Sequence, residues 1–62
     1  MRIEYDKKTD SLYIEFRTEP STESEEVQPG IVFDYDKNGK VVGIDIEHAS
    51  DIADVENLPV SR

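Results

Sequence analysis

The stretch "DYDKNGKVVGID" (residues 34–45) decides how this sequence is interpreted, because it fits two different structures. Its alternating carboxylates, its glycine and the aspartate at its twelfth position are typical of a calcium-binding loop. An EF-hand loop, however, lies between two helices and ends in a bidentate glutamate. Here both flanks alternate between apolar and polar residues, which indicates half-buried β-strands. The stretch is therefore interpreted as the turn of a β-hairpin.

The same strand–turn–strand pattern occurs twice in the chain, at an offset of 30 residues. "IEYDKKTDSLYIEF" begins at Ile3 and "FDYDKNGKVVGIDI" begins at Phe33. A gapless alignment matches a tyrosine and an aspartate before the two turns and the lysine that begins each turn. The first copy has neither the glycine nor the full calcium spacing. What the two copies share is therefore a β-hairpin and not a metal loop.

The register of each hairpin follows if its large apolar side chains share one face of the sheet. The first hairpin then pairs Tyr5 with Leu12. The second pairs Tyr35 with Val42, which leaves "KNGK" as a four-residue loop. Such loops are commonly built around a type I turn, and Gly39 can take the left-handed conformation that closes one.

We predict an α+β fold in which a four-stranded antiparallel sheet of two consecutive β-hairpins is followed by a short C-terminal helix. Residues 1–62 form a single small domain. The strands are expected near residues 2–6, 11–17, 30–36 and 40–47. Ser50 offers an N-cap and Pro59 a stop for a helix near residues 50–58, whose apolar edge would cover the apolar side of the sheet.

Residues 18–26, "TEPSTESEE", contain no large apolar side chain. We expect them to form an acidic flexible connection between the two hairpins. Pro29 and Gly30 then indicate a bend or bulge at the start of the third strand, because proline cannot donate a hydrogen bond to a β-ladder.

Length and charge narrow the classes of function. The chain has 62 residues, with 15 acidic against 7 basic side chains and a formal net charge of -8. Such a chain repels nucleic acid. It has no apolar run of the ~20 residues that a membrane span needs and no signal-peptide pattern, so we expect a cytoplasmic protein of prokaryotic style. Without cysteine, a core this small is commonly stabilised by oligomerisation.

The chemistry that the sequence offers is sparse. His48 is the single histidine, and its neighbours Ser50 and Asp51 are adjacent in sequence, whereas catalytic triads are defined by geometry in space. We therefore expect neither an enzyme nor a cofactor. A weak site for calcium or magnesium remains an alternative, because hard cations prefer oxygen ligands. Its ligands would be Asp34, Asp36 and Asp45, on the outward face of the second hairpin.

The two hairpins resemble a family of short prokaryotic domains of unknown function, number 2283. The shared pattern is a tyrosine–aspartate start, a "D-x-L-Y-I" strand and a "D-Y-D-x-x-G-x-V-V-G-I-x-I" hairpin that ends in "A-S". In this chain the pattern falls on Tyr5, Asp6, Asp10, Leu12, Tyr13, Ile14, Asp34, Tyr35, Asp36, Gly39, Val41, Val42, Gly43, Ile44, Ile46, Ala49 and Ser50. The resemblance implies no established activity, and it loosely implies neighbouring genes for small toxin-like proteins.

The favoured hypothesis is a small acidic interaction module, an antitoxin-like or regulatory partner of a small basic protein. A self-associating structural domain, working as a homo-oligomer, is the second hypothesis, and the weak cation binder is the third. Contacts are expected at Tyr13, Val32 and Val41 and at the strand edge near Pro29. Val32 and Val41 are expected to add apolar patches to an otherwise acidic face.

Overall fold

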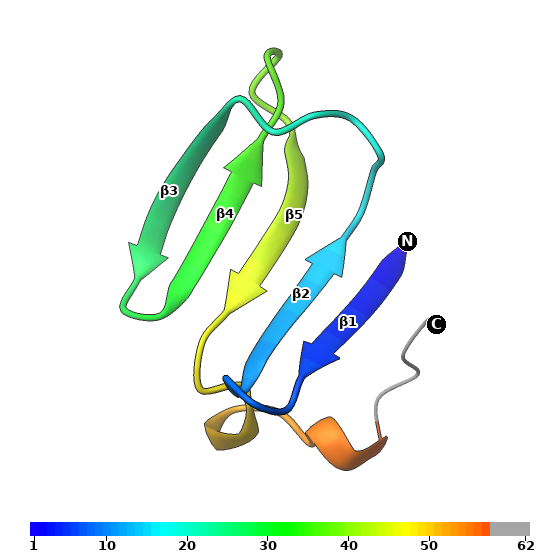
Figure 1. Cartoon of the computed structure of the whole chain (residues 1–62). Coiled ribbons are helices and arrows are strands. Elements are labelled where there is room, and N and C mark those ends of the chain that lie inside the picture. Colours follow the sequence, from blue (N-terminus) through cyan, green and yellow to red (C-terminus); the bar gives the residue numbers. More distant parts are fainter. Residues whose placement is uncertain (58–62) are drawn as a thin grey trace.

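The computed structural model describes residues 1–57, which form one antiparallel β-sheet and two 3-10 turns. The elements are β1 (Arg2–Asp6), β2 (Ser11–Glu15), β3 (Glu23–Gln28), β4 (Ile31–Tyr35), β5 (Val41–Ile46), η1 (Ala49–Asp51) and η2 (Val55–Asn57). The sheet has five strands in the order β1-β2-β5-β4-β3 (Figure 1). No helix among the described residues is long and apolar enough to span a membrane.

The strand order places β2 beside β5, although β3 and β4 lie between them in the sequence. Strands β3, β4 and β5 form a meander of neighbours. Residues 16–22 connect β2 to β3 and pass the ends of β5 and β4 to reach the far edge (Figure 1). Strands β2 to β5 therefore have the connectivity of a Greek key.

The predicted register of the first hairpin is confirmed, with Tyr5 opposite Leu12. The second hairpin departs from its predicted register at one point. Tyr35 pairs with Val41 instead of Val42, because the register shifts between Asp34 and Tyr35. Such a β-bulge sets two residues of one strand against one of its partner. Gly39 closes the turn in the left-handed conformation, with φ 78°.

The predicted four-stranded sheet is wrong, because Glu23–Gln28 forms a fifth strand, β3, that pairs with β4. All six residues of β3 are exposed. An edge strand with no buried side shows no apolar alternation, so the sequence pattern gave no sign of it. Residues 23–26 are therefore part of the sheet, and they do not belong to a flexible connection over 18–26.

The predicted C-terminal helix is also wrong. The described part of residues 50–58 forms 3-10 turns, η1 and η2, which lie at one end of the sheet (Figure 1); Leu58 lies outside the described residues. Ser50 does not cap a helix, since its backbone N–H and its hydroxyl both donate to Asp10. Ile52, which would lie on the apolar edge of the predicted helix, is 61% exposed. A helix this short depends on packing to form, and that packing is missing here.

One side of the sheet, called the apolar face below, carries two rows of apolar side chains. Within each row, the residues lie opposite one another on neighbouring strands. The first row consists of Ile3, Ile14, Ile44 and Phe33, and the second of Tyr5, Leu12, Ile46 and Ile31. Among the described apolar residues only Leu12, Val42 and Ala49 are buried. The molecule measures 34 × 26 × 16 Å. Sheet and turns thus form a single layer with a thin core.

Candidate interaction surfaces

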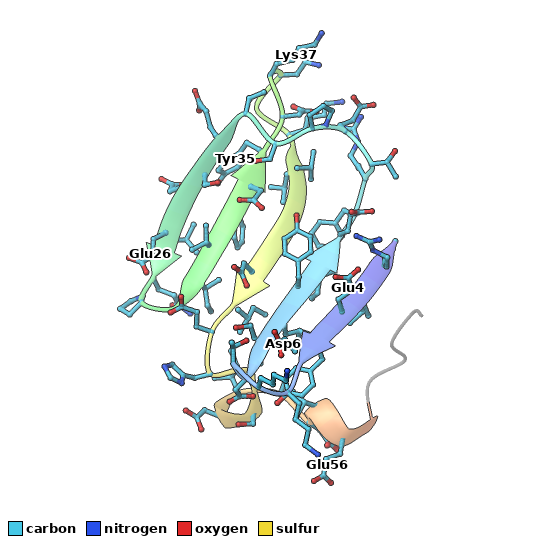
Figure 2. The ribbon with its side chains drawn as sticks, in the orientation of Figure 1. Glu4, Asp6, Glu26, Tyr35, Lys37 and Glu56 are labelled. Atoms are coloured by element: carbon cyan, nitrogen blue, oxygen red, sulfur yellow. The ribbon has the colours of Figure 1, made fainter. Side chains whose placement is uncertain are left out.

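The opposite side of the sheet is predominantly acidic and is called the acidic face below. Its two rows are Glu4, Tyr13, Asp45, Val32 and Glu26, and Arg2, Glu15, Gly43, Asp34 and Ser24. Figure 2 shows Glu4 and Glu26 on opposite edges of the sheet. Arg2 is the one cation in these rows, and it pairs with both Glu4 and Glu15 at 3.1 Å.

Tyr13 lies near the middle of the acidic face and covers Gly43 on the neighbouring strand. A β-carbon added to Gly43 would lie 2.6 Å from Cζ of the Tyr13 ring, so only glycine leaves room for it. The Tyr13 hydroxyl donates to Asp34 Oδ2 at 3.2 Å. Burial and the charge of Asp34 raise the pKa of Tyr13. The ring is therefore fixed in place, and its hydroxyl stays protonated at neutral pH.

Asp45 lies between Tyr13 and Val32 in its row, so no cation stands opposite it on either neighbouring strand. Burial is the main cause that raises the pKa of Asp45, and the charges of Glu47 and Asp34 add to it. A carboxyl group in this position gains from an approaching cation, because a positive charge lowers the cost of its ionisation.

Strand β3 forms a fully exposed acidic edge of the sheet. It carries Glu23, Glu25 and Glu26 within six residues. Glu25 accepts a hydrogen bond from the Tyr35 hydroxyl at 3.0 Å. On the side away from β4, β3 has no strand neighbour among the described residues. An edge of this kind presents unpaired backbone groups to another chain.

The structure separates the three predicted cation ligands. Asp34 and Asp45 lie on the acidic face, whereas Asp36 lies in the β4–β5 turn, where it is only 6% exposed. Asp36 Oδ1 accepts the backbone N–H groups of Asn38 at 2.9 Å and Lys40 at 3.0 Å. Within residues 1–57, no group of three or more His, Cys, Asp or Glu side chains is placed to hold a metal ion.

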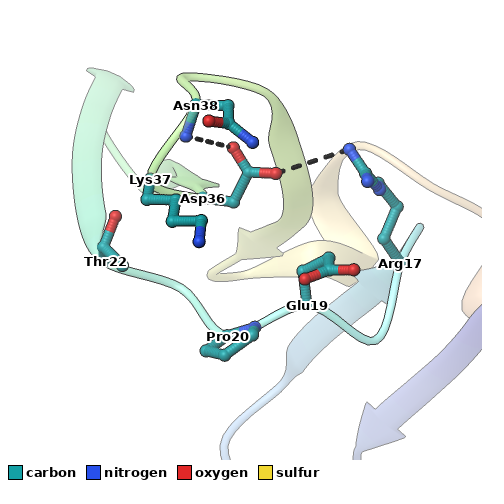
Figure 3. A pocket seen from close by; sticks show the side chains of 7 residues that line it. All are labelled: Arg17, Glu19, Pro20, Thr22, Asp36, Lys37 and Asn38. Atoms are coloured by element: carbon teal, nitrogen blue, oxygen red, sulfur yellow. Dashed lines mark hydrogen bonds and ion pairs between the residues drawn. The ribbon is translucent and has the colours of Figure 1, made fainter.

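Asp36 also borders a hollow of about 340 Å³ between the β4–β5 turn and the β2–β3 connection (Figure 3). Its Oδ2 lies 3.4 Å from Arg17 Nη1. The Lys40 N–H bond is the main cause that lowers the pKa of Asp36, followed by the Asn38 bond and the charge of Arg17. Small-molecule sites are mostly apolar. Here six of the seven lining residues are polar or charged, and the buried carboxylate of Asp36 already holds the turn together.

A cluster around Asp10 was not expected from the sequence, although its members belong to the family pattern. Asp10 accepts the hydroxyl of Tyr5 at 2.5 Å and that of Ser50 at 2.6 Å, and its carbonyl accepts the N–H of Ala49 at 2.9 Å. Asp10 has φ 54°, in the left-handed region that aspartate tolerates. A nucleophilic serine donates to a base that can take its proton. Ser50 instead donates to a carboxylate whose pKa its own hydrogen bond lowers, so the cluster ties η1 to the β1–β2 turn.

Two of the three predicted contact residues share the acidic face. Tyr13 and Val32 both lie opposite Asp45, on the two neighbouring strands. Val41 does not join them, because the β-bulge pairs it with Tyr35, whose hydroxyl contacts Glu25 on β3. The edge near Pro29 lies at the turn between β3 and β4, next to the acidic edge.

These observations define a small all-β domain with one apolar and one acidic face. The chain belongs to the family described as "Protein of unknown function (DUF2283)", whose model matches residues 2–50. The match spans all five strands, which confirms the resemblance inferred from the two hairpins. No curated protein and no solved structure matches the chain.

Proposed function

We propose that this protein is a non-catalytic interaction module that binds a basic protein through β3 and the adjoining acidic face. The observation that carries the proposal is the composition of β3, an exposed edge strand with three glutamates among its six residues. Glu26 lies in the same row of the acidic face as Asp45, so the negative charge extends from the β3 edge onto the acidic face.

The binding mode that suits this edge is the addition of a strand. A partner segment in extended conformation would pair with the free side of β3, and main-chain hydrogen bonds would supply affinity. Lysine or arginine side chains of the partner would meet Glu23 on one side of the sheet and Glu26 on the other. Opposite charge also speeds association and disfavours wrong partners.

The same charges keep two copies of β3 apart. Two such strands paired with each other would bring like charges together, which is destabilising. The β3 edge therefore disfavours pairing with a second copy of β3 and favours pairing with a basic segment. An antitoxin-like or regulatory role follows from this chemistry, in which the acidic module covers and neutralises a small basic protein.

The proposal is tested by retention of basic proteins from an extract of the native host on three immobilised forms of the full chain. The first is the wild type, and the second carries Glu23→Lys and Glu26→Lys. The third carries Asp51→Lys and Glu56→Lys, a matched change of charge in the 3-10 turns. A basic protein should bind the first and third forms, and its retention should fall as salt rises.

The β3 variant should lose that protein. Its binding to all three forms would contradict the proposal, because the β3 charges would then not matter. Its loss from the two variants alike would also contradict the proposal, because only total charge would then matter. Circular dichroism of each variant confirms that the sheet is intact. The retained protein is then titrated against the wild type and the β3 variant to measure the fold-change in Kd.

A further inference from the structure

The apolar face is open along its first row, whereas Leu12 in the second row is buried. The 3-10 turns lie at the end of the sheet and do not cross it (Figure 1). Across the first row, Ile3, Ile14, Ile44 and Phe33 all remain partly exposed. An apolar sheet face of this kind is normally covered by a second layer. In residues 1–57 the chain provides no such layer.

The chain exposes more surface than a compact protein of its size. The accessible surface of the chain is 4675 Å², whereas a compact protein of 7.1 kDa exposes about 4,100 Å². The excess of roughly 600 Å², summed over the whole chain, is of the same order as the ~800 Å² that each partner contributes to an interface of standard size.

We propose that a second copy of this chain covers the apolar face and that the two sheets form a face-to-face β-sandwich dimer. Two copies related by a two-fold axis bring identical apolar rows together, and packed sheets lie ~10 Å apart. The central rows contain no charged residue, so no charge is buried. Glu23 and Glu25 lie at the β3 margin, where an interface is polar and wet.

The net charge of -8 does not oppose this arrangement strongly. In the dimer the two acidic faces point outward from opposite sides of the sandwich, about 20 Å apart when two sheets are stacked. That separation exceeds the Debye length of about 8 Å at physiological ionic strength. The dimer also leaves the backbone of both β3 edges free to pair with a basic partner, although Glu23 lies at the margin of both interfaces.

The dimer is tested first by mass and by labelling of the unmodified chain. Light scattering after size exclusion, from micromolar to millimolar concentration, should give a mass about twice 7.1 kDa at the upper end. In a mixture of labelled and unlabelled chains, isotope-filtered NOEs should connect the methyl groups of Ile14 and Ile44 and the ring of Phe33 between copies. A mass of one chain at every concentration, or intermolecular NOEs at Val32 and Tyr13 instead, would overturn the proposal.

A matched pair of variants separates the two faces. Ile14→Lys places a charge on the apolar face, and Val32→Lys places one on the acidic face, at two positions of similar partial exposure. The Ile14→Lys variant should have the mass of one chain, and the Val32→Lys variant should keep the mass of two chains. Equal masses for the two variants would contradict the dimer. If Ile14→Lys fails to fold, the filtered NOEs of the unmodified chain decide the question.

Discussion

The β1–β2 and β4–β5 hairpins have nearly the same sequence pattern, yet their turns stabilise the protein in different surroundings. Asp6 and Asp36 occupy equivalent positions, and each accepts a backbone N–H two residues further on, from Lys8 and Asn38, both at 2.9 Å. Asp6 is exposed, whereas Asp36 is buried beside the β2–β3 connection. We therefore expect the aspartate of the turn to contribute more to the stability of the protein at Asp36, where the surrounding structure encloses it, than at Asp6.

A second difference concerns positions 13 and 43, which are also equivalent in the two copies. One holds tyrosine and the other glycine. Because β2 and β5 are neighbours in the sheet, the ring of Tyr13 occupies the space that a side chain at Gly43 would need. The two hairpins are thus complementary and not interchangeable.

The largest expected effects come from Leu12 and Val42, which are equivalent in the repeat and nearly inaccessible, at 3% and 2% exposure. Leu12→Ala should lower the free energy of unfolding by about 2–5 kcal/mol, the usual cost of truncating a buried leucine. Val42→Ala should cost less, because fewer carbon atoms are removed. Urea unfolding of the two variants measures both losses.

Ile52→Ala is the control for this pair, since Ile52 is 61% exposed. It should leave the unfolding midpoint nearly unchanged. A loss at Leu12 no greater than that at Ile52 would show that the thin core contributes little to stability.

Gly43→Ala should destabilise the domain by about 1–3 kcal/mol, the usual cost of overpacking. The new methyl group meets the Tyr13 ring and lies 3.2 Å from the carbonyl oxygen of Ile14. A double-mutant cycle with Tyr13→Ala checks the cause by thermal unfolding. Gly43→Ala should cost less when Tyr13 is already alanine, and an equal cost in both backgrounds would show that the ring is not responsible.

Asp36→Ala should lower the urea midpoint clearly more than Asp6→Ala. The first variant leaves two N–H groups of the turn without their acceptor and Arg17 without its ion pair. Since the pKa of Asp36 is lowered on folding, its ionised form stabilises the protein above the ordinary value of 3.8. That advantage over the variant should shrink as the pH falls below 3.8. Equal midpoints for both variants would contradict the role given to burial.

Much of the sheet was predictable, because alternation specifies both the face and the register of strands that are buried on one side. The register of the first hairpin followed from pairing Tyr5 with Leu12 and Ile3 with Ile14 on one face. Strand β3 left no such pattern, since neither of its sides is buried. The pairing of β2 with β5 was also not predictable, because contacts between distant segments require no local signal.

For the candidate surfaces, the sequence predicted an excess of acidic residues but not the positions of those residues in the fold. Acidic excess indicated a basic partner, but the position of the excess depends on β3 being an edge strand. The bulge adds one residue to β5 and so moves Val41 away from the face that carries Val32. The alternation of apolar and polar residues in the sequence gives no clear sign of this extra residue. The contact between Asp10 and Ser50 joins residues 40 apart, so only the fold brings them together.

The smallest expected effects compare Glu15 with Asp45, equivalent carboxylates on the acidic face. Glu15 pairs with Arg2, half of whose side chain is exposed, so Glu15→Gln should cost at most about 1 kcal/mol. The folded protein raises the pKa of Asp45, so ionisation of Asp45 opposes folding. Asp45→Asn should therefore match the wild type below pH 3.8 and become the more stable form as the pH rises through the raised pKa. Thermal unfolding across this range measures the difference, and a variant less stable than the wild type at neutral pH would show that Asp45 has a favourable partner within the chain.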